Sequence, residues 1–164
     1  MKKLLVALMM VLPMCASAQK FGHFDSAAVI QSMPEYTTAQ NEVQAKAKTY
    51  EDELKRMQDE LQKKAEDFDK ESATLPEAIK TRRQNELQEM YQKIQTYAQD
   101  AQQNMQKTEQ EKMQAISQKL TKAIEEVGAA GGYAFVLVDG SMPYINKSVC
   151  TDVTAQVKSK LGLK

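Results

Sequence analysis

Residues 34–127 form a long stretch in which apolar side chains recur at steps of four and three, separated mostly by Lys, Glu, Asp and Gln. Such spacing places the apolar residues on one narrow stripe of a helix, as in a coiled-coil seam. A stripe two positions in seven wide holds two helices together but gives no globular core. The expected seam is Val43, Ala47, Tyr50, Leu54, Met57, Leu61 and Phe68, then Leu87, Met90, Ile94, Tyr97 and Ala101, with a one-step shift through Met105 and Thr108 before Ile116, Leu120, Ile124 and Val127.

Pro76 interrupts this stretch and predicts a chain reversal. In "TLPE", Thr74 and Glu77 have the spacing of a capping box at the start of a helix, where proline is tolerated. The residue before a proline is disfavoured in α geometry, so the first helix should end just ahead of it. The same pattern, "SMPE", occurs at residues 32–35. Two start signals favour an antiparallel helical hairpin with its tip near 72–78 over a kinked rod.

The segments on either side of the hairpin predict a small β body. "KFGHFD" indicates a short strand, followed by a short helix in "SAAVIQSM". Gly128 is expected to cap the second long helix, and "YAFVLV" before "DG" indicates a strand. "PYIN" is interpreted as another strand and "TDVTAQVKSKLG" as a last helix with Thr151 as its cap. The fold class is mainly α with a small β body: a long antiparallel helical (coiled-coil) hairpin projects from a short-stranded oligomerisation sheet.

The predicted sheet is apolar on both faces of "YAFVLV", so both faces need cover. A body this small buries little surface alone, which makes self-assembly the expected remedy. We therefore expect a homo-oligomer held at the sheet. The residues assigned to this contact are Phe21, Phe24, Phe135, Val136, Leu137 and Val138.

The first eighteen residues have the pattern of a secretory signal peptide. A basic start, a short apolar run and "ASA" predict cleavage after Ala18 and export from the cytoplasm. Lipid attachment at Cys15 is the alternative. The expected organisation is a signal peptide at 1–18, the β body at 19–33 and 128–164, and the hairpin at 34–127.

Residues that carry chemistry are few. The chain has one histidine, His23, expected to be an ordinary strand residue, and Cys150 is expected to be a small buried hydrophobe. There is no nucleophile–base constellation, cofactor motif or metal-ligand spacing, so we expect neither an enzyme nor a cofactor. Export would leave 20 basic against 22 acidic residues, which gives no nucleic-acid signature.

The terminal segments resemble the Skp/OmpH family of periplasmic chaperones of outer-membrane proteins. "FVLVDGSMPYINKSVCTDVTAQV" is similar to the end of that family through Asp139, Tyr144 and the run 152–154, and "FGHFDSAAVIQSMPEY" resembles its opening. The resemblance implies a periplasmic homotrimer whose hairpins surround a cavity for unfolded outer-membrane proteins, without ATP. Known members are strongly basic whereas this chain is near neutral, so no lipopolysaccharide-binding residues are carried over. Transient contact with a membrane or with lipopolysaccharide is kept as a further expectation.

A non-catalytic coiled-coil scaffold or tether of the cell envelope is the alternative function. What separates the two is whether the arms keep a face for a client. Glutamines at helical spacing line the second helix, either as a solvated face or as a neutral cavity wall. These are Gln84, Gln88, Gln92, Gln95, Gln99, Gln103, Gln106, Gln110, Gln114 and Gln118. Candidate client-facing residues on the arms are Met90, Tyr91, Met105 and Met113.

Overall fold

The computed structural model describes residues 19–163 and divides them into two compact units. One is a hairpin unit of residues 27–122 with Leu163, and the other is a sheet unit of residues 19–26 and 123–162. The predicted signal peptide, its cleavage site and Cys15 lie outside the described residues.

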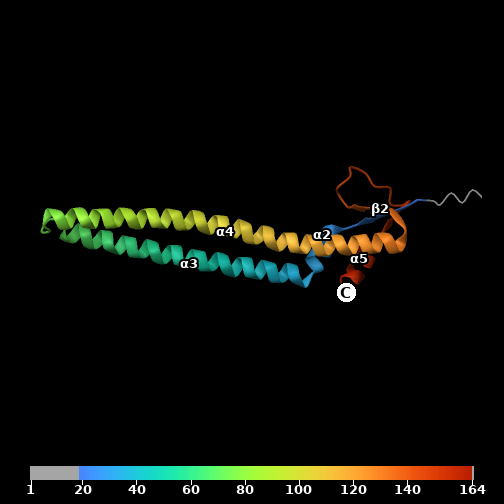
Figure 1. The fold of residues 1–164 in the computed structure, drawn as a ribbon, viewed down its shortest axis with the longest axis horizontal. Helices are drawn as coiled ribbons and strands as arrows, with labels where there is room; N and C mark the ends of the chain where they lie inside the picture. The colour runs from blue at the N-terminus through green and yellow to red at the C-terminus, as the bar shows by residue number, and fades with distance from the viewer. Residues whose placement is uncertain (1–18, 164) are drawn as a thin grey trace, which may run out of the picture. The chain divides into compact units, whose positions relative to one another are not determined.

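The hairpin unit contains nearly all of a short helix, α2 (Ser26–Ser32), the long helix α3 (Pro34–Glu71), and residues 77–122 of a second long helix, α4 (Glu77–Gly131). The two long helices run side by side in opposite directions, joined by a short turn (Figure 1). The chain therefore reverses at residues 72–76, where Pro76 was predicted to begin a helix.

Neither predicted capping box forms. The Ser32 hydroxyl donates back to the carbonyl of Ala28 at 2.6 Å, and the Thr74 hydroxyl donates back to Glu71 at 2.9 Å. Both side chains thus bond to the helix that ends, because its last carbonyls also lack partners. At the tip, the carbonyl of Pro76 accepts two amide hydrogen bonds from the first turn of α4, both at 3.0 Å. Proline geometry starts α4 without a side-chain cap.

The seam between α3 and α4 follows the predicted residues with one exception. Ala47 is exposed, and Lys46 takes its place, with Nζ donating to Thr108 Oγ1 at 2.7 Å. The long aliphatic stem of a lysine can cover apolar surface while its amine reaches a polar partner. One turn further, Tyr50 and Tyr97 pack edge to face with ring centroids 5.9 Å apart. The buried seam residues are Ala39, Ile94, Ala101, Ile116 and Leu120.

The sheet unit contains three strands, β1 (Lys20–Phe24), β2 (Tyr133–Val138) and β3 (Cys150–Asp152), and a last helix, α5 (Thr154–Lys160). The strand order is β2–β1–β3, and both pairings are parallel. The predicted pairing of the first strand with "YAFVLV" is confirmed, and β1 lies at the centre of the sheet.

Three predictions for this unit are wrong: the end of the second long helix, the strand at "PYIN" and the helix cap at Thr151. Helix α4 continues past Gly128 to Gly131 and is followed by Gly132, whose φ of 64° is the left-handed geometry that ends helices. "PYIN" is not a strand. The third strand instead occupies 150–152, so Thr151 is a strand residue, and the backbone amide of Thr154 is held by Asp152 Oδ1 at 2.8 Å.

We predict that the turn at 72–76 is the least protected part of the hairpin. It has few apolar contacts, so its amides should exchange with solvent by local opening rather than by unfolding of the whole chain. Hydrogen exchange followed by mass spectrometry should show exchange in this segment faster than in β2 by orders of magnitude. Equal protection in the two segments would contradict the prediction.

Candidate interaction surfaces

One face of the sheet is filled by helices of its own unit. A Cβ placed on Gly22 would lie 3.4 Å from side-chain atoms of Val136 and of Val153, and Val153 is fully buried. Phe24 is on this face too, two residues from Gly22, and is 1% exposed. The backbone of Gly128 in α4 also approaches Val136. This face is therefore the internal core of the sheet unit.

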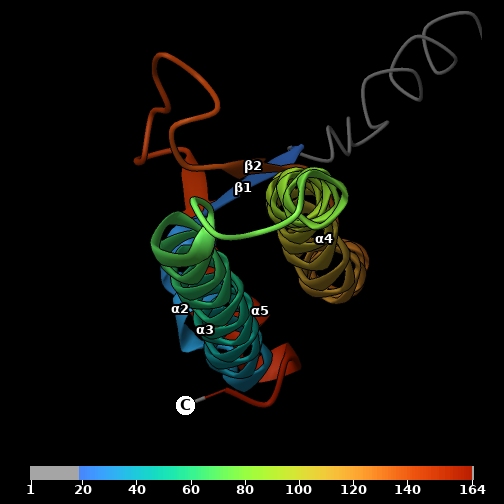
Figure 2. The same ribbon diagram turned by 90° about the vertical axis from the view of Figure 1, so that its left-hand side faces the viewer.

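The opposite face carries exposed aromatic and aliphatic side chains. Phe21 and Phe135 stack across β1 and β2 with ring centroids 6.3 Å apart and an interplanar angle of 3°. Phe135 nevertheless remains 64% exposed, and Leu137 is half-buried beside it. The loop of residues 139–149 and helix α5 lie on opposite sides of the sheet (Figure 1 and Figure 2). Exposed apolar side chains of that loop are Met142, Tyr144 and Val149.

The six residues assigned to oligomerisation divide between the two faces. Phe24 is buried in the core of its own chain, and Val136 and Val138 share its face by strand alternation. The other three lie on the opposite face, on the same side of the sheet as the loop 139–149 (Figure 2): Phe21, Phe135 and Leu137. We call these three residues the open sheet face.

His23 lies in β1 as expected, but it has a partner that sequence reasoning missed. Its side chain is 3% exposed, and Nδ1 lies 2.8 Å from Asp139 Oδ1. The amide of Asp139 also donates to the carbonyl of Phe24 at 2.9 Å. Because His23 pairs with Leu137 in the β1–β2 register, Asp139 follows on the same face. This bond holds the start of the 139–149 loop against the sheet.

Hydrogen bonds also order the other end of that loop. The carboxyl group of Asp152 accepts hydrogen bonds from the side chain and from the backbone amide of Thr154. These bonds lower the pKa of Asp152, and the side-chain bond has the larger effect. Thr154 Oγ1 in turn accepts from the amide of Asp25 at 3.0 Å. Cys150 is 6% exposed, as predicted for a small buried hydrophobe.

Ion pairs connect α3 and α4 near both ends of the hairpin. Between them, the middle of the seam is apolar and includes the Tyr50–Tyr97 contact. Charged pairs at two separated levels fix which residues face each other, whereas a narrow apolar stripe specifies this register weakly. The cross-helix pairs are Glu35–Lys119, Glu42–Lys112, Lys64–Glu86 and Glu71–Arg83.

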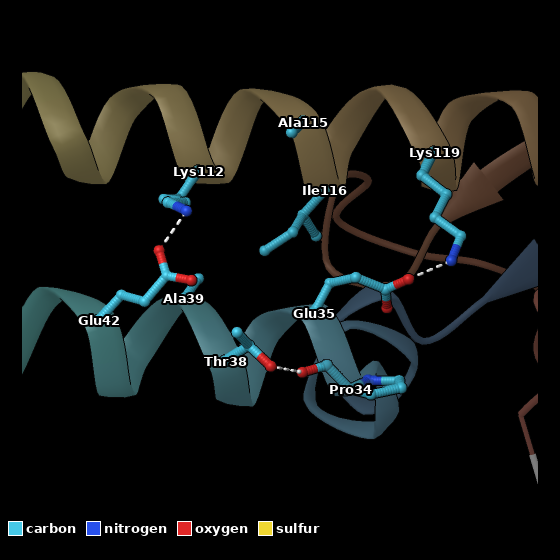
Figure 3. A pocket seen from close by; sticks show the side chains of 9 residues that line it. All are labelled: Pro34, Glu35, Thr38, Ala39, Glu42, Lys112, Ala115, Ile116 and Lys119. Atoms are coloured by element: carbon cyan, nitrogen blue, oxygen red, sulfur yellow. Dashed lines mark hydrogen bonds and ion pairs between the residues drawn. The ribbon is translucent and has the colours of Figure 1, made fainter.

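A groove lies between α3 and α4 where small side chains meet. Ala39 and Ala115 line it, and Ile116 projects into it, as Figure 3 shows. Its volume is about 510 Å³. Two of the cross-helix pairs flank it, so its rim carries no net charge, and its lining holds no nucleophile–base arrangement. The flanking pairs are Glu35–Lys119 and Glu42–Lys112.

The four candidate client-facing residues of α4 fall into two groups by their exposure. Met90 and Met105 are half-buried, and Met90 contacts the groove that also contains Met57 and Ile94. Tyr91 and Met113 point outward and are 55% and 43% exposed.

Residues 19–163 bear on two other kinds of site. No helix there is both long and apolar enough to cross a bilayer. Nor does that part of the chain bring together three or more His, Cys, Asp or Glu side chains in an arrangement that could hold a metal ion.

We predict that acid removes the contribution of the cross-helix pairs. Hydrogen bonds from Lys119 and Lys64 lower the pKa values of Glu35 and Glu86 below their ordinary value of 4.5. Because the pKa values are lowered in the folded chain, each pair stabilises the hairpin fully at pH values above the ordinary pKa. This stabilisation is lost as the pH falls through the lowered pKa. Glu35→Gln with Glu86→Gln should reduce Tm slightly at pH 7 and not at pH 3, measured by circular dichroism.

The control for this prediction is Glu109→Gln, because Glu109 is exposed on α4 and forms no ion pair among the described residues. Its Tm should match the unaltered chain at both pH values. A difference between the double variant and the unaltered chain that persists at pH 3 would show that the pairs act through packing rather than charge.

Comparison with known proteins identifies the family of this chain. Residues 20–161 match the model of the family described as Outer membrane protein (OmpH-like). The chain is similar to the chaperone protein Skp of Yersinia enterocolitica, with 26% identity over 164 residues that cover 96% of this chain and 100% of the relative. Its fold is similar to a solved structure from Caulobacter crescentus CB15 described as an OmpH-like outer membrane chaperone. That structure has a TM-score of 0.76, 20% identity, and coverage of 87% of this chain and 83% of the other. The chain belongs to the OmpH-like outer membrane protein family.

Proposed function

We propose that this protein is an ATP-independent periplasmic holdase that binds unfolded outer-membrane β-barrel proteins and prevents their aggregation. The observation that carries the proposal is the family match, which extends over residues 20–161 and so includes the hairpin and the whole sheet. The Yersinia enterocolitica relative, which is covered over its full length, is named a chaperone. A holdase needs no catalytic residues, only surfaces that compete with aggregation.

The working unit in this proposal is a homotrimer joined at the open sheet face. A face with Phe135 64% exposed and an unpaired outer edge on β2 invites association with another chain. Cyclic association of identical subunits covers this face in every copy, so that no copy of the face stays exposed to water. Three hairpins would then border a cavity for the client.

Release of the client would depend on weak contacts rather than on nucleotide hydrolysis. The arms offer methionine and tyrosine side chains and the aliphatic stems of lysine and arginine, all of which exchange partners readily. Basic and acidic residues balance overall, and many are paired along the hairpin. Electrostatic capture of an acidic client, of lipopolysaccharide or of a membrane surface is therefore a minor contribution.

A non-catalytic scaffold or tether of the envelope is the second candidate. The observation in its favour is the regular pairing of α3 with α4 by ion pairs near both ends, which suits a spacer of fixed length. A spacer would keep its arms solvated and would leave an unfolded client to aggregate.

We predict that a carboxylate on the open sheet face separates the subunits without unfolding them. Phe135→Asp with Leu137→Asp would place unpaired charges in the proposed contact, and such burial is strongly unfavourable. The subunit dissociation constant should rise at least about 100-fold, equivalent to about 2.7 kcal/mol. Light scattering should report a monomer at micromolar concentration, with unchanged helical circular dichroism.

Val136→Asp is the matched control because the neighbouring side chain of β2 points to the opposite, helix-covered face. That variant should lower Tm of the subunit through its own core, with a loss of about 2 kcal/mol or more. If the unaltered chain is itself a stable monomer at micromolar concentration, the homotrimer is excluded.

The holdase activity should be visible when a urea-unfolded outer-membrane barrel is diluted into buffer with or without this protein. Turbidity should fall strongly in its presence without nucleotide. Because exposed charges are the part of binding that salt screens, raising salt from 0.05 to 0.5 M should weaken protection by less than about twofold. Equal aggregation with and without the protein would favour the scaffold. Protection that disappears at high salt would still support the chaperone function. It would contradict the proposal that charged groups contribute little to client binding.

A further inference from the structure

The outward side of α4 is nearly free of charge in the middle of the arm. Among the thirteen residues 94–106 only Asp100 is charged, whereas fourteen of the twenty-one residues 51–71 of α3 are charged. The ten glutamines of the α4 row are all exposed. Within residues 19–163, none of their side-chain amides makes a hydrogen bond to another residue. Each therefore keeps a donor and an acceptor available at the surface.

Apolar side chains recur beside this row once per seven residues. Tyr91, Ala98 and Met105 are seven apart, and Met113 follows after eight. Tyr91 and Met113 are exposed, and the other two are half-buried. Met105 also belongs to the seam toward α3, which contains Ala101, whereas Tyr91 and Met113 point outward. We call this second stripe and its adjacent glutamines the glutamine flank.

The composition of the glutamine flank argues against a helix as its permanent partner. A stable helix pair needs about two apolar positions in seven, as α3 and α4 themselves have, and the flank has one. Its sparse apolar groups and open amides instead fit a partner that presents polar backbone together with scattered apolar side chains. An unfolded segment in extended conformation has that chemistry, because its N–H and C=O groups are not paired.

We propose that the glutamine flank binds the uncharged transmembrane-strand segments of unfolded outer-membrane proteins in preference to their charged loops. This inference rests on the proposed holdase function and specifies which part of the client is held. Membrane-spanning strands alternate apolar with polar residues in segments of about ten. Glutamine amides can donate to their carbonyls and accept from their amides, while Tyr91 and Met113 contact the apolar side chains. Charged loop segments keep their water, because the middle of the flank, residues 94–106, offers Asp100 as its single charge.

The first test replaces Gln95→Glu, Gln99→Glu and Gln103→Glu, which keeps side-chain size and adds three negative charges to the flank. The matched control places the same charges on exposed positions of α3, as Gln40→Glu, Gln44→Glu and Gln58→Glu. Fluorescence anisotropy would measure binding of a labelled, urea-unfolded eight-stranded outer-membrane protein at 0.15 M salt. Circular dichroism and light scattering would show whether both variants keep their fold and assembly.

The flank variant should bind about tenfold more weakly, since removing amide donors and adding carboxylates leaves backbone carbonyls facing negative charge. The α3 control should stay within about twofold of the unaltered chain. Equal weakening in the two variants, or none in either, would overturn the inference while leaving the holdase function intact. Failure of the unaltered chain to bind the client would instead refute the proposed function.

The second test identifies the segments that are held. A photoreactive p-benzoylphenylalanine at position 91 would be cross-linked to the same unfolded client, and the linked peptides would be sequenced by mass spectrometry. Cross-links should fall mainly in membrane-strand segments, and a probe at position 58 of α3 should give far fewer. Cross-links concentrated in charged loops would overturn the preference stated here.

Discussion

The narrow seam between α3 and α4 is the constraint on which the hairpin depends. Only a few side chains, such as Ile94, Ala101 and Ile116, are buried there, so no three-dimensional core forms along the seam. Cross-helix ion pairs near both ends fix which residues of α3 face which residues of α4. An apolar stripe that occupies two positions in seven specifies this register only weakly. An arm of this kind uses one side of each helix for its own structure, and the rest of its surface is available for other contacts.

The small sheet solves a different physical problem. Three strands can bury only one face against the helices of their own unit, and Gly22 lets Val136 and Val153 close that face tightly. The second face keeps Phe135 exposed, although its stacking partner Phe21 and the bonded His23–Asp139 pair order the strands beneath it. The polar bond matters because it places the loop after β2 beside the apolar residues. An ordered apolar face is a better template for association than a mobile one, since less conformational entropy is lost when it is covered.

Much of this fold could be predicted from sequence, and the failures have physical causes. The reversal at Pro76 and the pairing of β1 with "YAFVLV" follow from proline geometry and apolar patterning. The capping boxes failed because Ser32 and Thr74 bond equally well to the preceding helix. The faces of β2 could not be assigned, because a strand that is apolar at every position has no alternation to read. His23 and Asp139 are 116 residues apart, and only the strand register brings them together.

A holdase that works without ATP needs a binding surface that loses its client when the client folds. Hydrogen bonds between glutamine amides and an unfolded backbone have this property, because each one replaces bonds to water with a small net gain. Affinity then comes from the number of simultaneous contacts along the client, rather than from any strong one. A finished β-barrel pairs its backbone groups between neighbouring strands, so the groups that the glutamine flank would bind are no longer offered. On this account the folding of the client itself would drive its release, and the scarcity of charge along residues 94–106 would keep the unfolded chain from being held too tightly to fold.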